Sequence, residues 1–89
     1  MIISFDPNKE RLNIKNHGIP LQKAKEMEWD TFISREDRRF AYGEIRMSGL
    51  GFIGLRLYNF VYVEQSDEHW RAISLRPATK QEMKYYAEA

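Results

Sequence analysis

The sequence contains no cysteine and only two histidines, which lie far apart along the chain. Without cysteine there is neither a disulfide scaffold nor a thiolate metal site, and so few histidines make zinc chemistry unexpected. No apolar run approaches the roughly 18 residues needed to span a bilayer. The first residues also lack the charged start and long apolar middle of a signal peptide. We therefore expect a cytoplasmic protein that uses no metal and no other cofactor.

The sequence also lacks a glycine-rich loop of the kind that binds nucleotide cofactors. Its middle contains Gly49, Gly51 and Gly54, but their spacing matches neither a P-loop nor a dinucleotide-binding fingerprint. There is no internal repeat, low-complexity tract or linker, and 89 residues suffice for one domain with a thin core. We expect a single domain over residues 1–89.

The net charge of +1 hides an uneven distribution of basic residues. All arginines but one lie between Arg35 and Arg76, whereas every lysine lies outside that window. The planar arginine fork holds phosphate through two hydrogen bonds, so arginines gathered on a sheet favour an anionic ligand. The alternative is that they form surface ion pairs, which are common and indicate little about function. The carboxylates available for such pairs are Glu36, Asp37, Glu44 and Glu64.

The N-terminal part of the chain carries signals for two helices behind a short apolar strand. Asp6 and Pro7 are an N-cap residue followed by proline at the first helical position, and Gly18 supplies a C-terminal stop. The first helix should therefore end at about Asn16. Ile19-Pro20 begins a second helix of about nine residues, in which apolar residues recur at helical spacing.

The middle of the chain changes to residues typical of strands. We expect a strand over Phe40 to Met47, a hairpin loop over Gly49 to Gly54 and a second strand over Leu57 to Glu64. This second strand is apolar or aromatic on both faces except at Asn59, which is typical of a central strand covered on two sides.

The C-terminal part predicts a strand that runs directly into a capped helix. Ile73 and Leu75 should face one way and Ala72 and Ser74 the other, as in a strand that His69 opens. The strand should end at Arg76, because Pro77 has no backbone donor for the ladder and favours an extended backbone at Arg76. Thr79 and Glu82 form a capping box, which starts a last helix directly after the cap. The element order is β-α-α-β-β-β-α, which indicates an α+β fold.

Arg46, Arg71 and Arg76 are the residues expected to form an anion site, because all three lie on predicted strands. In a regular strand Arg71 and Arg76 point to opposite faces, so both serve one site only if Arg76 lies at the strand end, beyond the pleat. A cross-strand pair with Glu64 is the alternative role for Arg71. His17 suits C-capping of the first helix, and an imidazole is also able to move protons near neutral pH.

Aromatic side chains offer a further means of contacting RNA, because unpaired bases stack on rings and on arginine planes. Most aromatics, including Phe60 and Trp70, are needed for the core of so small a chain, and Tyr85 is the one expected to be exposed. The residues predicted to contact RNA are Lys80, Arg56, Tyr85 and Tyr86.

Taken together, these motifs resemble the BrnT family of type II toxins, small ribonucleases similar in fold to the RelE toxins. The resemblance covers nearly the whole chain, and the order and spacing of its parts make it specific. The matching parts are Phe5-Asp6-Pro7 with Lys9 and Asn13, His17-Gly18-Ile19, Tyr42-Gly43-Glu44 with Arg46, Val61-Tyr62, and Arg71 to Arg76 with Ala78, Thr79, Glu82 and Tyr86.

The resemblance implies a RelE-like fold with a small, twisted, mainly antiparallel sheet, and a metal-independent endoribonuclease that cleaves mRNA and inhibits translation. It also implies a DNA-binding, BrnA-like antitoxin that neutralises the toxin and represses their operon, so that operator DNA is contacted only through the antitoxin. Asn16 and Gln65 stand where the family usually has a basic residue. The site residues carried over from the family are His17, Arg46, Arg71, Arg76 and the segment from Glu82 to Tyr86.

We therefore predict that the chain cleaves RNA by attack of a 2′-hydroxyl on the adjacent phosphate, giving a cyclic phosphate and a free 5′-hydroxyl. Arg76 and Arg46 would stabilise charge on the phosphoryl oxygens, and Arg71 would orient the substrate. His17 is the candidate for proton transfer. The alternative is a non-catalytic module on the same fold that binds RNA or only the antitoxin.

Overall fold

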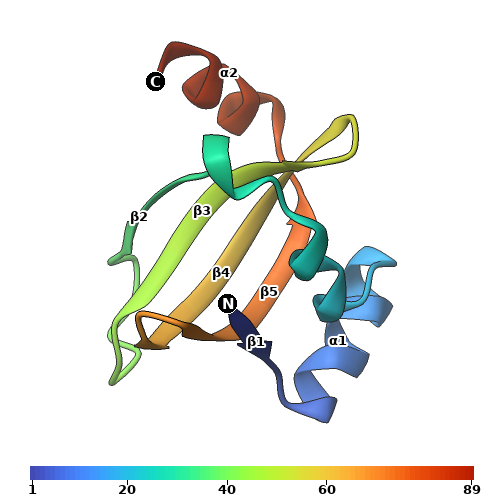
Figure 1. The fold of residues 1–89 in the computed structure, drawn as a ribbon, viewed down its shortest axis with the longest axis vertical. Helices are drawn as coiled ribbons and strands as arrows, with labels where there is room; N and C mark the ends of the chain where they lie inside the picture. The colour runs from blue at the N-terminus through green and yellow to red at the C-terminus, as the bar shows by residue number, and fades with distance from the viewer.

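The computed structural model describes residues 1–89 and contains one five-stranded sheet with helices on both of its faces (Figure 1). The strands are β1 (Ile2–Ser4), β2 (Ile33–Asp37), β3 (Arg46–Ile53), β4 (Arg56–Ser66) and β5 (His69–Pro77). The α-helices are α1 (Pro7–His17) and α2 (Lys80–Glu88), and two 3₁₀ segments, η1 (Leu21–Glu26) and η2 (Trp29–Thr31), connect α1 to β2. No helix has the length and apolar character needed to cross a membrane.

The strands lie in the order β1-β5-β4-β3-β2, so the long β4 occupies the centre. β1 is parallel to β5, and every other neighbouring pair is antiparallel. The α+β class, the mainly antiparallel sheet and a central strand over Leu57 to Glu64 are thus confirmed. The predicted element order lacks one strand, because Ile33–Asp37 forms an edge strand that pairs with β3.

Local capping chemistry defines the ends of both α-helices. The Asp6 side chain accepts a hydrogen bond from Asn8 N at 2.9 Å, and Gly18 closes α1 in the left-handed conformation at φ 71°. At α2, Glu82 N donates to Thr79 Oγ1 at 3.1 Å while Thr79 N donates to Glu82 Oε1 at 2.9 Å. These bonds satisfy backbone donors that a helix start otherwise leaves without partners. The predicted boundaries of both helices are confirmed to within about one residue.

The predicted second helix is wrong as an α-helix, because the segment forms the 3₁₀ piece η1. It spans six residues and ends with Met27 N donating to Ala24 O at 3.1 Å. So short a segment gains little from α-helical propagation, and 3₁₀ pieces of this length are common connectors. Leu21 and Ala24 are completely buried, so burial of their side chains holds η1 in place.

The main core lies on the face of the sheet that α1, η1 and η2 cover. Phe60, Tyr62 and Leu75 are completely buried there, and the Tyr62 ring stacks on Trp70 with ring centroids 4.0 Å apart. Asn13 of α1 is buried beside them; its amide accepts from Leu75 N at 3.0 Å and donates to Leu75 O at 2.8 Å. These bonds satisfy a buried polar side chain and attach α1 to β5 on this face.

The predicted hairpin loop over Gly49 to Gly54 is wrong, because Gly49 and Gly51 lie inside β3. Both glycines face the main core at positions where other side chains already fill the space. A Cβ on Gly49 would overlap the Phe32 ring, and a Cβ on Gly51 would lie 2.5 Å from Met27 Sδ. The glycines therefore permit close packing within a strand and do not mark a turn.

The β3–β4 turn comes later, at Gly54, which has φ 62°. β3 begins at Arg46, so most of the strand predicted over Phe40 to Met47 is a loop. A loop in this position connects the antiparallel strands β2 and β3 and brings its polar side chains to one end of the sheet.

A β-bulge in β5 changes which of its side chains reach the face opposite the main core. Val61 and Tyr62 are neighbours on β4, but their partners Ser74 and Ala72 are two residues apart, so Ile73 has no partner. One extra residue reverses the alternation of faces between the two parts of a strand.

α2 packs over one end of this second face of the sheet, where a small second core lies. Leu50, Leu57 and Ala78 are buried in this core. Tyr86 of α2 packs edge-on against Phe52 at 5.6 Å between ring centroids, and no residue of α2 is itself fully buried. In Figure 1, α2 lies at the top of the sheet and α1 lies beside β1 and β5 at the lower right.

Candidate functional site

A depression of about 580 Å³ lies on the second face of the sheet, next to α2. Its lining comes from β2, β3, β4, β5, the loop that follows β2, and α2. We call it the arginine groove, because arginines outnumber carboxylates among its lining residues and make it attractive to anions. Its charged lining residues are Arg35, Arg38, Arg39, Arg46, Arg76, Glu36, Asp37 and Glu82.

The bulge at Ile73 places Arg71 and Arg76 on the same face of β5. Arg71 lies opposite Val63 before the bulge, and Arg76 lies opposite Asn59 after it. Arg71 and Arg76 are five positions apart, so in a strand without the extra residue their side chains would lie on opposite faces. Regular alternation predicts that Arg71 and Arg76 share a site only if Arg76 lies beyond the end of the strand. This is wrong, because Arg76 lies within β5.

Glu44 connects Arg46 to Arg71 beside the groove. Its Oε2 accepts a hydrogen bond from Arg46 Nε at 3.2 Å, and its Oε1 accepts one from Arg71 Nη2 at 2.6 Å. The guanidinium of Arg46 also lies 4.2 Å from the centroid of the Tyr42 ring, a cation–π contact that orients it. The carboxylate partner of Arg71 is therefore Glu44 and not the predicted Glu64.

Arg76 forms a two-pronged pair with Glu82 at the start of α2. Nη1 donates to Oε1 at 2.7 Å and Nη2 donates to Oε2 at 2.9 Å. Hydrogen bonding from Arg76 is the main cause that lowers the pKa of Glu82, and burial opposes it. Asn59 Nδ2 adds a bond to Glu82 Oε2 at 3.1 Å and another to Ser48 Oγ at 3.1 Å. One network thus joins β3, β4, β5 and the N-terminus of α2.

Asp37 anchors the loop that forms one wall of the groove. Its carboxylate accepts hydrogen bonds from Arg39 Nε at 2.9 Å, from Arg39 Nη2 at 3.0 Å and from the Tyr42 hydroxyl at 3.1 Å. The side chain of Asp37 is only 3% exposed. Hydrogen bonding from the Arg39 side chain is the largest of the effects that lower the pKa of Asp37 to about 2.

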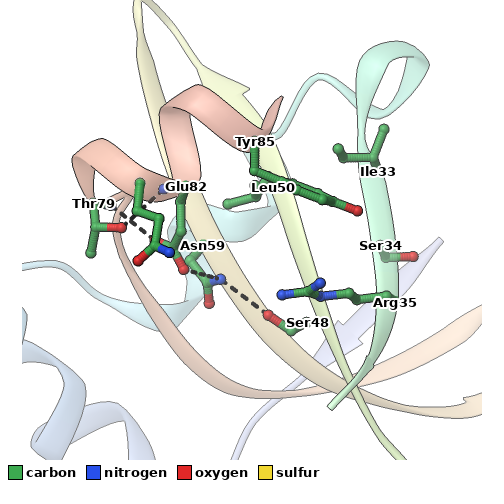
Figure 2. A pocket seen from close by; sticks show the side chains of 10 residues that line it. Ile33, Ser34, Arg35, Ser48, Leu50, Asn59, Thr79, Glu82 and Tyr85 are labelled. Carbon is green, nitrogen blue, oxygen red and sulfur yellow. Dashed lines mark hydrogen bonds between the residues drawn. The ribbon is translucent and has the colours of Figure 1, made fainter. Parts of the chain in front are cut away.

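Arg35 differs from the other arginines of the groove because it has no carboxylate partner. Its guanidinium carbon lies 5.1 Å from the centroid of the Tyr85 ring. Figure 2 shows Arg35 reaching from β2 and Tyr85 from α2. Tyr85 is 48% exposed, as its sequence position predicts.

Four of the predicted site residues lie away from the arginine groove. His17 is exposed at the end of α1, which covers the opposite face of the sheet. Arg56 lies opposite Ile53 beside the β3–β4 turn, and Lys80 is exposed at the start of α2. Tyr86 packs on the second core and donates its hydroxyl to Thr31 O at 2.9 Å. The structure thus unites Arg46, Arg71 and Arg76 but not these four.

Sequence reasoning missed Glu44 and Arg35 as site residues. Arg35 and Asp37 lie on one face of β2, but the sequence pattern, although typical of strands from Thr31 onward, does not delimit a separate strand there. Glu44 lies in a loop, and its bond to Arg71 spans 27 positions of sequence, so no local pattern predicts it. No group of three or more histidine, cysteine, aspartate or glutamate side chains is arranged to hold a metal ion.

Comparison with known proteins gives two findings. A family model described as the ribonuclease toxin BrnT of type II toxin–antitoxin systems matches residues 5–82. The crystal structure of the Brucella abortus ribonuclease toxin BrnT is similar, with a TM-score of 0.65 and 23% sequence identity over 90% of this chain and 99% of that chain. At this identity, the likeness shows a shared fold. No curated protein sequence gives a significant match.

Proposed function

Because the chain belongs to the BrnT family of ribonuclease toxins of type II toxin–antitoxin systems, we propose that its arginine groove is the site that cleaves RNA. The substrate is mRNA, and its cleavage inhibits translation. The observation that carries the proposal is the shared face of Arg46, Arg71 and Arg76, two of which line one groove. Such a cluster suits a phosphodiester whose charge increases during cleavage. We also propose that the fold of this chain is related to that of the RelE toxins.

The chemistry we propose is attack of a 2′-hydroxyl on the adjacent phosphorus. A bond forms between the 2′-oxygen and phosphorus while the bond to the 5′-oxygen breaks. The 5′-oxygen takes a proton from solvent, which leaves a 2′,3′-cyclic phosphate and a 5′-hydroxyl. Arg76 and Arg46 stabilise the phosphoryl oxygens, and Arg71 orients the backbone. In this scheme the RNA phosphate replaces Glu82 and Glu44 as the partner of these arginines. The guanidinium groups supply the positive charge, so we propose that cleavage is independent of metal.

The proton of the 2′-hydroxyl needs an acceptor near these arginines, and we assign that role to Glu44. Its carboxylate bonds to both Arg46 and Arg71 and its side chain is 32% exposed, so a bound ribose can reach it. Asp37 is only 3% exposed, and Glu82 already accepts hydrogen bonds from Arg76, Asn59 and Thr79, so neither carboxylate is as accessible to the ribose. His17 lies at the end of α1 on the other face, so the proposal no longer includes it.

The direct test incubates the purified protein with mRNA in EDTA, both free and bound to ribosomes. Cleavage in either sample, with cyclic phosphate and 5′-hydroxyl ends, supports the proposal. Arg46→Gln and Arg76→Gln should each lower the cleavage rate about 10²-fold, by analogy with removal of one charge-stabilising donor. Arg11→Gln, an exposed change on α1, is the matched control and should leave the rate unchanged. Intact RNA in both samples would contradict the proposal.

Arg76 also holds the N-terminus of α2, so its variant needs a structural control. Glu82→Gln removes the same ion pair but keeps the guanidinium in the groove. If Arg76 acts on the phosphate, Glu82→Gln retains much more activity than Arg76→Gln at equal thermal stability. Equal losses in the two variants would show that Arg76 acts only through the helix.

The role of Glu44 is tested by comparing Glu44→Gln with His17→Ala. Removing a general base lowers the rate about 10²- to 10⁴-fold, and the acidic limb of the pH–rate profile should disappear. His17→Ala should leave both the rate and the profile unchanged. A lost acidic limb in His17→Ala, with Glu44→Gln active, would return the proton-transfer role to the histidine.

Membership of a type II toxin–antitoxin family also implies an antitoxin partner. We propose that this partner is a DNA-binding protein of the BrnA type, and that the toxin reaches operator DNA only through it. Co-purification of the two proteins, followed by gel shifts on operator DNA, tests this arrangement. The complex and the antitoxin alone should shift the DNA, and the toxin alone should not.

A non-catalytic RNA-binding module is the second candidate, because Arg46, Arg71 and Arg76 each have a carboxylate partner in the free protein. Gel shifts that weaken with salt, without cleavage or growth arrest on expression, would favour it. A purely antitoxin-binding role predicts instead that Arg76→Ala abolishes antitoxin binding and has no effect on RNA.

A further inference from the structure

A second depression, of about 520 Å³, adjoins the arginine groove and lies between α2 and strands β2, β3 and β4 (Figure 2). We call it the Tyr85 pocket. It shares Arg35, Ser48, Asn59 and Glu82 with the arginine groove, so a ligand that occupies one reaches directly into the other. If a phosphate of RNA lies in the arginine groove, a nucleotide next to it is close enough to enter the Tyr85 pocket.

The pocket presents an aromatic ring and a guanidinium plane to a ligand. Tyr85 is half exposed, and the Arg35 guanidinium lies 5.1 Å from its ring centroid. Because Arg35 has no carboxylate partner, a ligand that contacts it breaks no ion pair. Tyrosine rings and arginine planes are the surfaces on which proteins stack unpaired bases.

The remaining lining suits the flat, polar-edged shape of a base. Ile33 and Leu50 contribute apolar surface. Asn59 is 4% exposed; its Nδ2 is used by Ser48 and Glu82, but no hydrogen bond is made to its Oδ1. Ser48 Oγ accepts from Asn59, so its own proton is available to a ligand. Asn59 Oδ1 and the Ser48 hydroxyl thus offer an acceptor and a donor among the residues that line the same pocket as Tyr85.

We propose that the Tyr85 pocket binds one unpaired nucleobase of single-stranded RNA, next to the phosphate that the arginine groove holds. The base stacks on Tyr85, its polar edge meets Asn59 Oδ1 and the Ser48 hydroxyl, and Arg35 bridges the two sites. The assignment of the phosphate rests on the proposed function. A base in a duplex has both faces covered by its neighbours, so the pocket selects single strands.

The test measures binding separately from cleavage, using oligonucleotides whose 2′-hydroxyls are replaced by hydrogen and which cannot be cleaved by 2′-hydroxyl attack. Fluorescence anisotropy compares the affinity of the protein for a series of these oligonucleotides that share one sequence, each lacking the base at a different single position. At the position facing the pocket, loss of the base should weaken binding about tenfold, in line with the contribution of base–aromatic stacking. Loss of the base elsewhere should have a much smaller effect.

Two variants at one position provide the matched comparison. Tyr85→Leu removes the ring and should abolish the difference between the intact and abasic oligonucleotides, whereas Tyr85→Phe should keep it. Tyr85 is half exposed and its hydroxyl makes no hydrogen bond within the protein, so both variants should fold, which a thermal melt checks. Arg35→Lys keeps the charge but loses the plane, and should lower the discrimination only in part.

The proposal is overturned if Tyr85→Leu weakens binding of intact and abasic oligonucleotides equally, or weakens neither. It is also overturned if Tyr85→Leu impairs antitoxin binding alone, because the pocket would then receive a protein segment. Base discrimination without any RNA cleavage would remove the proposed ribonuclease function and leave this inference standing. RNA cleavage by the wild type without any difference between intact and abasic oligonucleotides would overturn this inference and leave the proposed ribonuclease function standing.

Discussion

Asp37 is the least exposed carboxylate of the arginine groove, and its ionisation is linked to folding. Its pKa in the folded protein, about 2, lies below the ordinary value of 3.8. The unfolded chain therefore takes up a proton at a higher pH than the folded protein does. Asp37 contributes stability above about pH 4, and this contribution is lost as the pH falls towards 2. The same pair raises the pKa of Arg39.

Replacing Asp37 by Asn should therefore destabilise the protein in a pH-dependent way. At pH 7 we expect the free energy of unfolding to fall by about 1–2 kcal/mol. This is less than the full pKa shift implies, because the Arg39 side chain is 69% exposed and solvent screens its charge. Urea unfolding of the wild type and Asp37→Asn between pH 7 and pH 2 checks this. The gap in free energy of unfolding should close towards pH 2, and a gap that stays constant would contradict the linkage.

Gly49 illustrates a residue whose role is visible only in three dimensions. Gly49→Ala should lower the free energy of unfolding by about 1–3 kcal/mol, because the new methyl group overlaps the Phe32 ring. Phe32→Leu provides the control. In a double-mutant cycle, the cost of Gly49→Ala should shrink markedly in the Phe32→Leu background, and purely additive costs would argue against this contact.

At the scale of elements, β5 presents Arg71 and Arg76 on one face only because of its bulge. Deleting Ile73 should restore regular alternation and turn either Arg71 or Arg76 towards the main core. Burying an unpaired arginine is costly, so we expect a loss of more than about 3 kcal/mol or a failure to fold. Ile73→Ala keeps the extra residue and should retain both the fold and RNA binding. Circular dichroism melts of the two variants make the comparison.

Elements defined by neighbouring residues were predictable from the sequence, whereas those defined by distant contacts were not. Asp6, Gly18 and the Thr79–Glu82 box act within one helical turn, and each of these helix ends is confirmed. Closely spaced glycines such as Gly49 and Gly51 are typical of a turn. Here they lie in a strand, because the Phe32 and Met27 side chains from another segment fill the space next to them. The bulge in β5 likewise depends on pairing with β4, which no spacing within β5 reveals.

The same distinction applies to the candidate site. Arg46, Arg71 and Arg76 were identified from their strands and are brought to one face. Their carboxylate partners come from a loop and from α2, and the predicted partner Glu64 was wrong for Arg71. Whether these arginines act on RNA stays a prediction for the experiments above.

At the scale of the whole molecule, a net charge of +1 gives little attraction to RNA, so binding depends on where the charge lies. If Arg46, Arg71 and Arg76 each make one charge-neutralising contact with the RNA backbone, the logarithm of the association constant should fall with the logarithm of salt concentration at a slope of about −2. Anisotropy titrations of an uncleavable oligonucleotide at several salt concentrations measure this slope. Arg76→Gln should make it shallower by nearly one unit, and a slope close to zero in the wild type would exclude phosphate contacts.

In the middle of β3, Gly49 and Gly51 leave room for Phe32 and Met27 on one face, while Arg46 and Ser48 reach the groove on the other. Substitutions at Arg46 or Ser48 therefore change the groove without repacking the main core, which lies on the other face of the strand. The charge and shape of the groove can thus change by substitution while the main core continues to hold the sheet in place.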